Sequence, residues 1–390
     1  MALILLSTKA LGLLTRKMNM PQVVGALLAG LILGPGLLGW ITQTDYIAKS
    51  AEIGVVVLMF CAGLETDVAE LKKAGKASFV IALMGVLLPL AGGFAVSFFF
   101  NRPGIIDSDA GCSLFLQNLF VGVILTATSV SITVEALREI GMLFSPAGSA
   151  ILGAAVIDDV LGIIALTIIT SFADSRVKIG VVFLKILGFF AFSLVVSFVF
   201  YFWFEKMCLA ADRPRKRHAI TVLVFCLIMS YCSERFFGVA DITAAFAAGL
   251  VVSLTPFKDY LIEKFDVVSS LYLSPIFFAS IGLKVVLPEM SGTVLVFAVL
   301  LTFIAALSKV AGCGLGAKLM DYSSRESLQI GVGMISRGEI ALIVADKGTS
   351  LGLISSQLIG PVVVVVIATT IVTPISLKAV FAEPQEVPAV

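Results

Sequence analysis

The apolar positions of this chain gather in long runs, without the short alternation of half-buried strands or the one-sided stripes of surface helices. Thirteen runs of about 13 to 28 residues can be read, and the short connections between them hold nearly all of the Lys, Arg, Asp and Glu. A helix needs roughly 20 apolar residues to cross a bilayer. We therefore predict thirteen spans, at about 2–14, 23–41, 51–64, 77–100, 114–137, 147–172, 179–204, 219–232, 242–254, 267–287, 294–319, 328–345 and 358–380.

Composition strengthens this prediction. The chain has 390 residues, of which 59% are apolar and only 14% charged, against roughly 25% charged in an average soluble domain. The first run has no small-residue cleavage site, so we interpret it as a span and not as a removed signal peptide. We expect an all-α polytopic membrane protein, 1–390 being one transmembrane domain, that contacts the lipid bilayer, is not an enzyme and has no nucleic-acid partner.

The basic residues indicate the orientation of the chain. They collect on alternate connections, with the largest cluster at 213–217, whereas the other connections hold few. Cytoplasmic loops carry such an excess of Lys and Arg. We expect the N-terminus outside and the C-terminus in the cytoplasm, which requires an odd number of spans.

Cysteine and histidine offer no site of their own. The six cysteines are scattered along the apolar runs without the paired spacing of a metal site or a disulfide framework. The only histidine, His218, is placed by the pattern in the basic cytoplasmic loop. We therefore expect neither a histidine metal site nor a buried histidine relay.

Weak internal similarity relates the two halves of the chain. The segment 26–31 resembles 245–250, and Gly63-Leu64 resembles Gly282-Leu283 at the same offset of 219 residues. Further matches join the fifth run to the twelfth and the sixth to the thirteenth. Because seven spans separate the copies, they would have opposite topology, as in many secondary transporters. We predict inverted repeats at about 22–173 and 240–381.

Two adjacent carboxylates, Asp158 and Asp159, lie near the centre of the sixth run. Each ionisable group there costs about 2.5–3.5 kcal/mol on insertion scales. Neighbouring helical positions point about 100° apart, so one aspartate can face a fixed cation while the other faces an aqueous cavity. Burial disfavours the ionised carboxylate and a nearby cation favours it, so the pair can exchange protons near neutral pH. Its oxygens also suit Na⁺. The alternative is a structural cap or helix pair.

Lys309 lies in the eleventh run among small residues that allow close helix contact. It is too central to reach the membrane surface easily, so we predict that it pairs with Asp158. A lysine that extends its side chain to the interface is the alternative.

Two runs carry polar segments that weaken a helix. The fifth has five hydroxyl residues within 126–133, including Thr126 and Thr128, and the twelfth has glycines, Arg337 and Glu339 within 331–339. We predict unwound helices there, whose free carbonyls and half-helix ends can line a cation site. The hydroxyls could instead join helices, and Arg337 with Glu339 could balance the half-helix ends. Glu135 with Arg138 is interpreted as a pair at the end of the fifth span.

These features together resemble bacterial Na⁺/H⁺ antiporters of the second monovalent cation/proton antiporter family, of the NapA type, over nearly the whole chain. The matching motifs are Gly-Ala-Ala-Val-Ile-Asp-Asp-Val-Leu-Gly at 153–162, Ile-Ser-Arg-Gly-Glu at 335–339, Ala-Thr-Ser at 127–129 and the glycines of 25–35. The resemblance implies the NhaA-like fold, with two crossing broken helices. A core bundle at about 75–173 and 290–381 would move against the remaining spans, which form the scaffold of a homodimer.

The resemblance also implies roles for the residues. Asp159 would be the principal carrier of Na⁺ and protons, Asp158 its partner, and Lys309 the cation that competes through Asp158. Thr126, Thr128 and Glu339 would be polar surroundings, with Arg337 a supporting charge. An Asp-Asp pair with an intramembrane lysine is the pattern of electrogenic members.

The expected function is therefore exchange of Na⁺ or Li⁺ for protons across the bacterial cytoplasmic membrane by alternating access, with no cofactor. The same oxygen ligands suit K⁺, so K⁺/H⁺ exchange or K⁺ efflux stays open. The K⁺-efflux branch commonly carries a nucleotide-binding domain, whereas this chain stops soon after the last run. An alternative of another class is a Na⁺-coupled symporter for an organic solute, which would need further polar groups.

Overall fold

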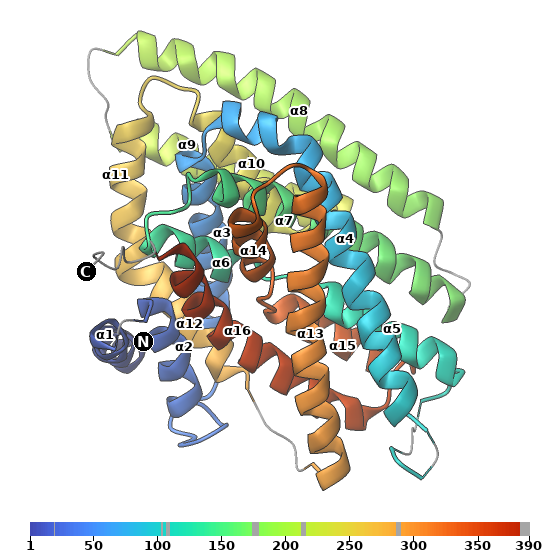
Figure 1. Ribbon diagram of the computed structural model, residues 1–390. Helices are drawn as coiled ribbons and strands as arrows, with labels where there is room; N and C mark the ends of the chain where they lie inside the picture. Colours follow the sequence, from blue (N-terminus) through green and yellow to red (C-terminus); the bar gives the residue numbers. More distant parts are fainter. Residues whose placement is uncertain are drawn as a thin grey trace, which may run out of the picture.

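The computed structural model describes residues 1–18, 20–102, 104–106, 110–173, 179–211, 216–285 and 290–382, apart from the side chains of Ala173, Glu339 and Ser356. Every regular element in these ranges is a helix (Figure 1). The α-helices are α1 (Ala2–Lys17), α2 (Gln22–Leu33), α3 (Asp45–Glu65), α4 (Val68–Phe100), α5 (Leu114–Thr126), α6 (Val130–Glu139), α7 (Pro146–Ala173), α8 (Ile179–Leu209), α9 (Lys216–Cys232), α10 (Asp241–Val252), α11 (Lys258–Val268), α12 (Ser274–Leu283), α13 (Gly292–Leu319), α14 (Ser324–Gly333), α15 (Glu339–Ser350) and α16 (Ile359–Phe381). Short π-helical turns, η1 (Ser233–Phe237) and η2 (Ser269–Leu273), precede α10 and α12, and a 3₁₀ turn, η3 (Ser356–Leu358), precedes α16.

The helices have the length and composition of a multi-pass membrane protein. Among the described residues, nine helical segments are long and apolar enough to cross a membrane, and α2 and α10 are shorter apolar helices. The long helix α8 follows one edge of the molecule (Figure 1). Many of its Leu, Val and Phe side chains are exposed, as expected of a surface that faces lipid tails. The all-helical prediction is confirmed, and the number of thirteen spans stays a prediction.

A central bundle surrounds α4 and α13, which pack along one another. Helices α5 and α7 also pack against α4, while α14 and α16 pack against α13. These six helices come from the segments 68–173 and 292–381, far apart in the sequence. The bundle therefore brings the aspartates of α7 close to the lysine of α13.

A second set of contacts joins α2 to α12 and α3 to α10 at glycines. A Cβ added to Gly30 would lie 1.9 Å from a backbone oxygen of α12, and one added to Gly63 would lie 2.1 Å from a backbone oxygen of α10. Their sequence counterparts, Gly249 and Gly282, make equally close backbone contacts to α3 and α2. Only glycine permits such approach, and closely packed backbones stabilise helix pairs in membranes. The boundaries of the two repeats stay a prediction.

His218 differs from the sequence interpretation. It lies in the first turn of α9, fully buried, with its ring edge against Phe204 and Phe257. The helix begins at Lys216, so Lys216 and Arg217 lie in the span and not in the loop before it. The ring therefore packs in the protein interior and not in a loop.

Candidate functional site

The aspartate pair lies in the middle of α7, a helix of 28 residues. The hydroxyl of Ser145 accepts a hydrogen bond of 3.0 Å from the Gly148 amide, and Pro146 occupies the first helical position. Both are favourable starts for a helix, because the first amides of a helix have no internal partner. The start of α7 is thus fixed by local chemistry, and its centre carries Asp158 and Asp159 to the border of the α4–α13 bundle.

Asp158 forms a closed ion pair with Lys309 on α13. The Lys309 ammonium donates hydrogen bonds of 2.9 and 3.1 Å to the two carboxylate oxygens of Asp158. The two side chains are 0% and 1% exposed. This is the partner that the sequence predicted for Asp158. A buried pair of this kind is held by charge attraction that solvent hardly screens, and either member alone would be costly to bury.

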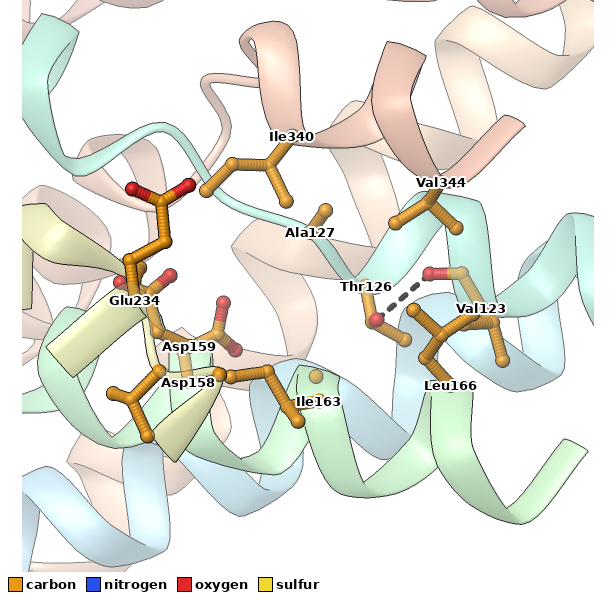
Figure 2. Close-up of a pocket in the computed structure, with 14 residues that line it drawn as sticks. Val123, Thr126, Ala127, Asp158, Asp159, Ile163, Leu166, Glu234, Ile340 and Val344 are labelled. Carbon is orange, nitrogen blue, oxygen red and sulfur yellow. Dashed lines mark hydrogen bonds between the residues drawn. The ribbon is translucent and has the colours of Figure 1, made fainter. Parts of the chain in front are cut away.

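Asp159 has different surroundings. It is partly exposed and borders a cavity of about 260 Å³, whose lining includes Asp158, Thr126 and Glu234. Its Oδ2 accepts a hydrogen bond of 3.5 Å from the hydroxyl of Thr243 on α10. Figure 2 shows the carboxylates of Asp158, Asp159 and Glu234 at one end of this cavity and apolar side chains at the other. No ion pair joins Asp159 to a cation in the described part of the chain, so its charge is available to a ligand.

The first helix break separates α5 from α6 at 127–129. Thr126 lines the same cavity as the aspartates, next to Val123 and Leu166, and its hydroxyl donates to the Val123 carbonyl at 2.7 Å (Figure 2). Thr128 is buried, donates to the Thr126 carbonyl at 3.5 Å and is not part of the cavity lining. Of the two threonines expected at the site, the structure therefore brings Thr126 to the cavity and places Thr128 behind it.

The second break separates α14 from α15 at 334–338 and carries Arg337. The Arg337 guanidinium is fully buried and donates to the carbonyls of Leu125 (2.8 Å), Ala305 (2.9 Å) and Ile335. Because the C-terminal end of a helix carries partial negative charge, this cation stabilises the end of α5. Arg337 thus supports the breaks and does not line the cavity. The side chain of Glu339 lies outside the described residues.

The two breaks cross and bind each other. The Ser129 amide donates to the Ser336 carbonyl at 2.8 Å, and the Ser336 hydroxyl donates to the Ser129 carbonyl at 2.7 Å. The Thr133 hydroxyl donates to the Gly333 carbonyl at 2.7 Å. Backbone groups that leave a helix must find partners inside a membrane protein. The hydroxyls that the sequence placed in these segments supply them, and the predicted pair of crossing broken helices is confirmed.

Charged side chains at the end of α6 away from the helix break join it to α3, α11 and α2. Arg138 on α6 pairs with Glu65 at the end of α3 and with Asp266 on α11, the latter at 2.8 Å. The Glu139 carboxylate accepts hydrogen bonds from the first two amides of α2. The sequence interpretation of Arg138 with Glu135 was therefore wrong: the side chain reaches other helices.

The Arg138–Glu65 pair lies far from the cavity at Asp159 and its neighbour, although Glu139 lines two other cavities, of about 480 and 680 Å³. Val55 on α3 borders a second cavity, of about 180 Å³, whereas Glu65 lies ten residues further along the same helix. At 1.5 Å per residue these positions are about 15 Å apart along the helix axis. The contact between α3 and α6 is thus open at one end and bridged by ion pairs at the other.

Two residues of this site were not found from the sequence, Thr243 and Glu234. Thr243 stands near the start of an apolar helix, where a single hydroxyl gives no signal of its own. Glu234 lies in η1, a segment that we interpreted from the sequence as a connection between two spans. A search for polar residues on all helix ends that face one side of the membrane would have included both.

Comparison with known proteins agrees with this geometry. Residues 2–383 match the family described as sodium/hydrogen exchanger, transmembrane. The Na(+)/H(+)-K(+) antiporter GerN of Bacillus cereus is 37% identical over 97% of this chain and 95% of its own, and the Na(+)/H(+) antiporter of Enterococcus hirae is 36% identical over 97% and 96%.

Among solved structures, the sodium proton antiporter MjNhaP1 of Methanocaldococcus jannaschii shares the fold, with a TM-score of 0.73 at 17% identity over 97% of this chain and 94% of that chain. This likeness agrees with the predicted antiporter fold, and the family match covers every described helix. The chain belongs to the sodium/hydrogen exchanger family of transmembrane proteins.

Proposed function

We propose that this protein exchanges Na⁺ or Li⁺ for protons across the bacterial cytoplasmic membrane by alternating access. One observation carries the proposal: Asp159, a carboxylate without a cation partner among the described residues, borders a cavity next to a closed Asp158–Lys309 pair. A partly buried carboxylate gains by binding either a proton or a monovalent cation. Both ligands compete for one site, and such competition is the basis of antiport.

The polar surroundings supply the remaining ligands. Oxygen atoms suit Na⁺, and the cavity offers carboxylate oxygens from both aspartates together with the hydroxyl of Thr126. Ala127, in the α5–α6 break, lines the same cavity. In this proposal the ion is cargo and Asp159 is its principal ligand.

The Asp158–Lys309 pair determines how many protons are exchanged for each cation. A cation that binds between Asp158 and Asp159 competes with the ammonium for the Asp158 oxygens, which are 2.9 and 3.1 Å from the Lys309 nitrogen. Once separated from Asp158, a fully buried ammonium is disfavoured and can lose its proton. One proton from Asp159 and one from Lys309 would then leave for each cation bound, which makes exchange electrogenic.

The moving part would be the core bundle, about 75–173 and 290–381, which carries the aspartates, the lysine and both helix breaks. The other spans would form the scaffold of a homodimer, with the N-terminus outside and the C-terminus in the cytoplasm. In that orientation the two cavities beside Glu234 open to the outside, and the Arg138 ion pairs bridge the contact between α3 and α6 at the cytoplasmic end. Movement of the core would break these pairs and open the cytoplasmic end.

Potassium is a second candidate ion. The printed name of one relative, at 37% identity, includes both Na⁺ and K⁺. The oxygen ligands at Asp158, Asp159 and Thr126 suit both ions, so the experiment below includes K⁺ beside Na⁺ and Li⁺.

The test uses purified protein in proteoliposomes with an imposed pH gradient and a pH-sensitive dye in the lumen. Adding Na⁺ or Li⁺ should move protons through the parent protein, with a membrane potential that a voltage-sensitive dye detects. Asp159→Asn should abolish this movement, because the amide cannot exchange a proton at neutral pH and has no negative charge to balance a bound cation.

Asp346→Asn is the matched control, since Asp346 is exposed on α15 and does not line the cavity. It should exchange ions like the parent. If the parent moves no protons with Na⁺, Li⁺ or K⁺, or if Asp159→Asn retains exchange, the proposed function is wrong, and uptake of organic solutes with Na⁺ becomes the activity to test.

A further inference from the structure

Glu234 lies on η1, the π-helical turn between α9 and α10. The turn ends at Gly238, whose φ of +67° is in the left-handed region that glycine adopts without strain. The Ser233 hydroxyl donates to the carbonyl of Val239 at 2.9 Å and holds the far side of the turn. π-helical turns of this kind often mark functional positions. The local structure therefore fixes where Glu234 stands relative to α10.

Glu234 lines two neighbouring cavities. It lines the cavity of about 260 Å³ that contains Asp158 and Asp159, and it also lines the neighbouring cavity of about 180 Å³ beside Ser129 and Ser131. Glu234 and Gly238 are exposed, whereas Asp158 is buried. The larger cavity thus leads from the protein surface, at Glu234, to the aspartate pair (Figure 2).

The charge of Glu234 is not neutralised by an ion pair in the described part of the chain. The nearby lysine, Lys49 on α3, is instead bound to Glu52 at 2.9 Å. A carboxylate at the mouth of a cavity with apolar walls focuses the electric field and raises the local concentration of cations. The lining of the larger cavity includes no Lys or Arg that would oppose this effect.

We propose that Glu234 is the first contact of the transported cation on this face: its carboxylate attracts a monovalent cation into the cavity and passes it to Asp159. The inference rests on the proposed exchange function and adds a specificity-determining residue to it. Because Glu234 belongs to the scaffold and Asp159 to the core, Glu234 serves only the face on which the cavity opens. It sets the apparent affinity there and leaves the turnover number unchanged.

The test is the concentration dependence of exchange in right-side-out and everted membrane vesicles from a host without its own antiporters. In right-side-out vesicles at low ionic strength, Glu234→Gln should raise the KM for external Na⁺ by about fivefold or more, because focused charge of this kind changes association by about tenfold or more. The kcat should stay that of the parent. Choline chloride should shrink the difference, because salt screens exposed charge. In everted vesicles, where Na⁺ arrives from the other face, the KM should be unchanged.

Two variants make the result specific. Glu234→Asp keeps the charge and should keep the KM near that of the parent. Asp346→Asn removes the same charge from an exposed position of α15 outside both cavity linings, and it should have little effect. An unchanged external KM in Glu234→Gln, or an equal loss of kcat on both faces, overturns the proposal. Failure of the parent to exchange any ion would instead refute the proposed function, so the two failures are distinguishable.

Discussion

Asp158 and Asp159 are neighbours in the chain, but the surroundings of their side chains differ in burial and in charge. On the Asp158 side, the carboxylate, the ammonium of Lys309 and the helices around them leave no exposed charge. On the Asp159 side, the carboxylate borders a cavity, and a long hydrogen bond from Thr243 is its contact with α10. The same residue type thus has a cation partner in one place and an open cavity beside it one residue later.

The difference shows how a transporter can keep charge in the membrane and still exchange it. A closed pair fixes the geometry of the bundle, since breaking it exposes an uncompensated charge. A carboxylate without a cation partner lowers the stability of the fold, and such residues are retained inside membrane proteins where function requires them. The contrast predicts that substitutions on the Asp158 side act first on stability, and those on the Asp159 side first on transport.

The largest expected effect on stability follows from removing the cation of the closed pair. Lys309→Met keeps much of the side-chain volume but leaves the Asp158 carboxylate buried without its partner. We therefore expect the free energy of unfolding to fall by about 3–5 kcal/mol. The measurement is the apparent Tm in detergent, followed by tryptophan fluorescence or a thiol-reactive dye.

The double variant Lys309→Met/Asp158→Leu removes both charges and should recover most of the lost Tm, although it should not transport electrogenically. If the double variant is as unstable as Lys309→Met alone, lost packing and not an unpaired charge explains the effect, and the contrast between the two sides fails.

A smaller effect on stability is expected from Asp159→Asn. This substitution neutralises a carboxylate that has no cation partner, so the apparent stability should stay within about 1 kcal/mol of the parent, even though exchange is lost. Asp158→Asn, the same change one residue earlier, should lower the Tm clearly because it leaves the Lys309 ammonium unpaired. Equal Tm values for the two variants would contradict the comparison.

The smallest effect is expected from Thr243→Val, which removes a hydroxyl with little change of shape. Its hydrogen bond to Asp159 is long, 3.5 Å. We therefore expect the free energy of Na⁺ binding to change by about 0.5 kcal/mol, which is roughly a two- to threefold shift in the KM for Na⁺. Thr243→Ser retains the hydroxyl and should behave like the parent. A shift of KM in Thr243→Ser as large as in Thr243→Val would show that the methyl group, and not the hydrogen bond, matters.

The main elements of the fold were predictable because membrane helices leave a strong signal in the sequence. Lipid cannot satisfy backbone polar groups, so each long apolar run must be helical, and the structure has a helix in every predicted run. The two breaks were predictable for the same reason, since hydroxyls, glycine and a charge inside an apolar run require an explanation. Asp158 with Lys309 was expected because two isolated buried charges of opposite sign are most stable when they meet.

The rest depended on contacts that no local pattern encodes. Arg138 was expected to pair within its own helix, but its two partners come from α3 and α11. Arg337 was expected to balance the helix ends, yet its binding to carbonyls of α5 and α13 could not be derived from its neighbours in sequence. Thr243 reaches Asp159, and Glu234 reaches the cavity, because of how α9 and α10 pack, which the apolar pattern leaves undetermined.

Arg337 also has an electrical consequence. Four charged groups lie at or beside the cavity: Asp158, Asp159, Lys309 and Arg337. In the proposed exchange a bound cation replaces the protons of Asp159 and Lys309, so the two carboxylates balance Arg337 and the cation, and the cation-loaded site is neutral. With both protons bound and no cation, the same groups leave one positive charge, worth about 2.3 kcal/mol per 100 mV for a full crossing of the membrane. Arg337 would thus make the proton-loaded carrier, and not the cation-loaded one, the voltage-sensitive form.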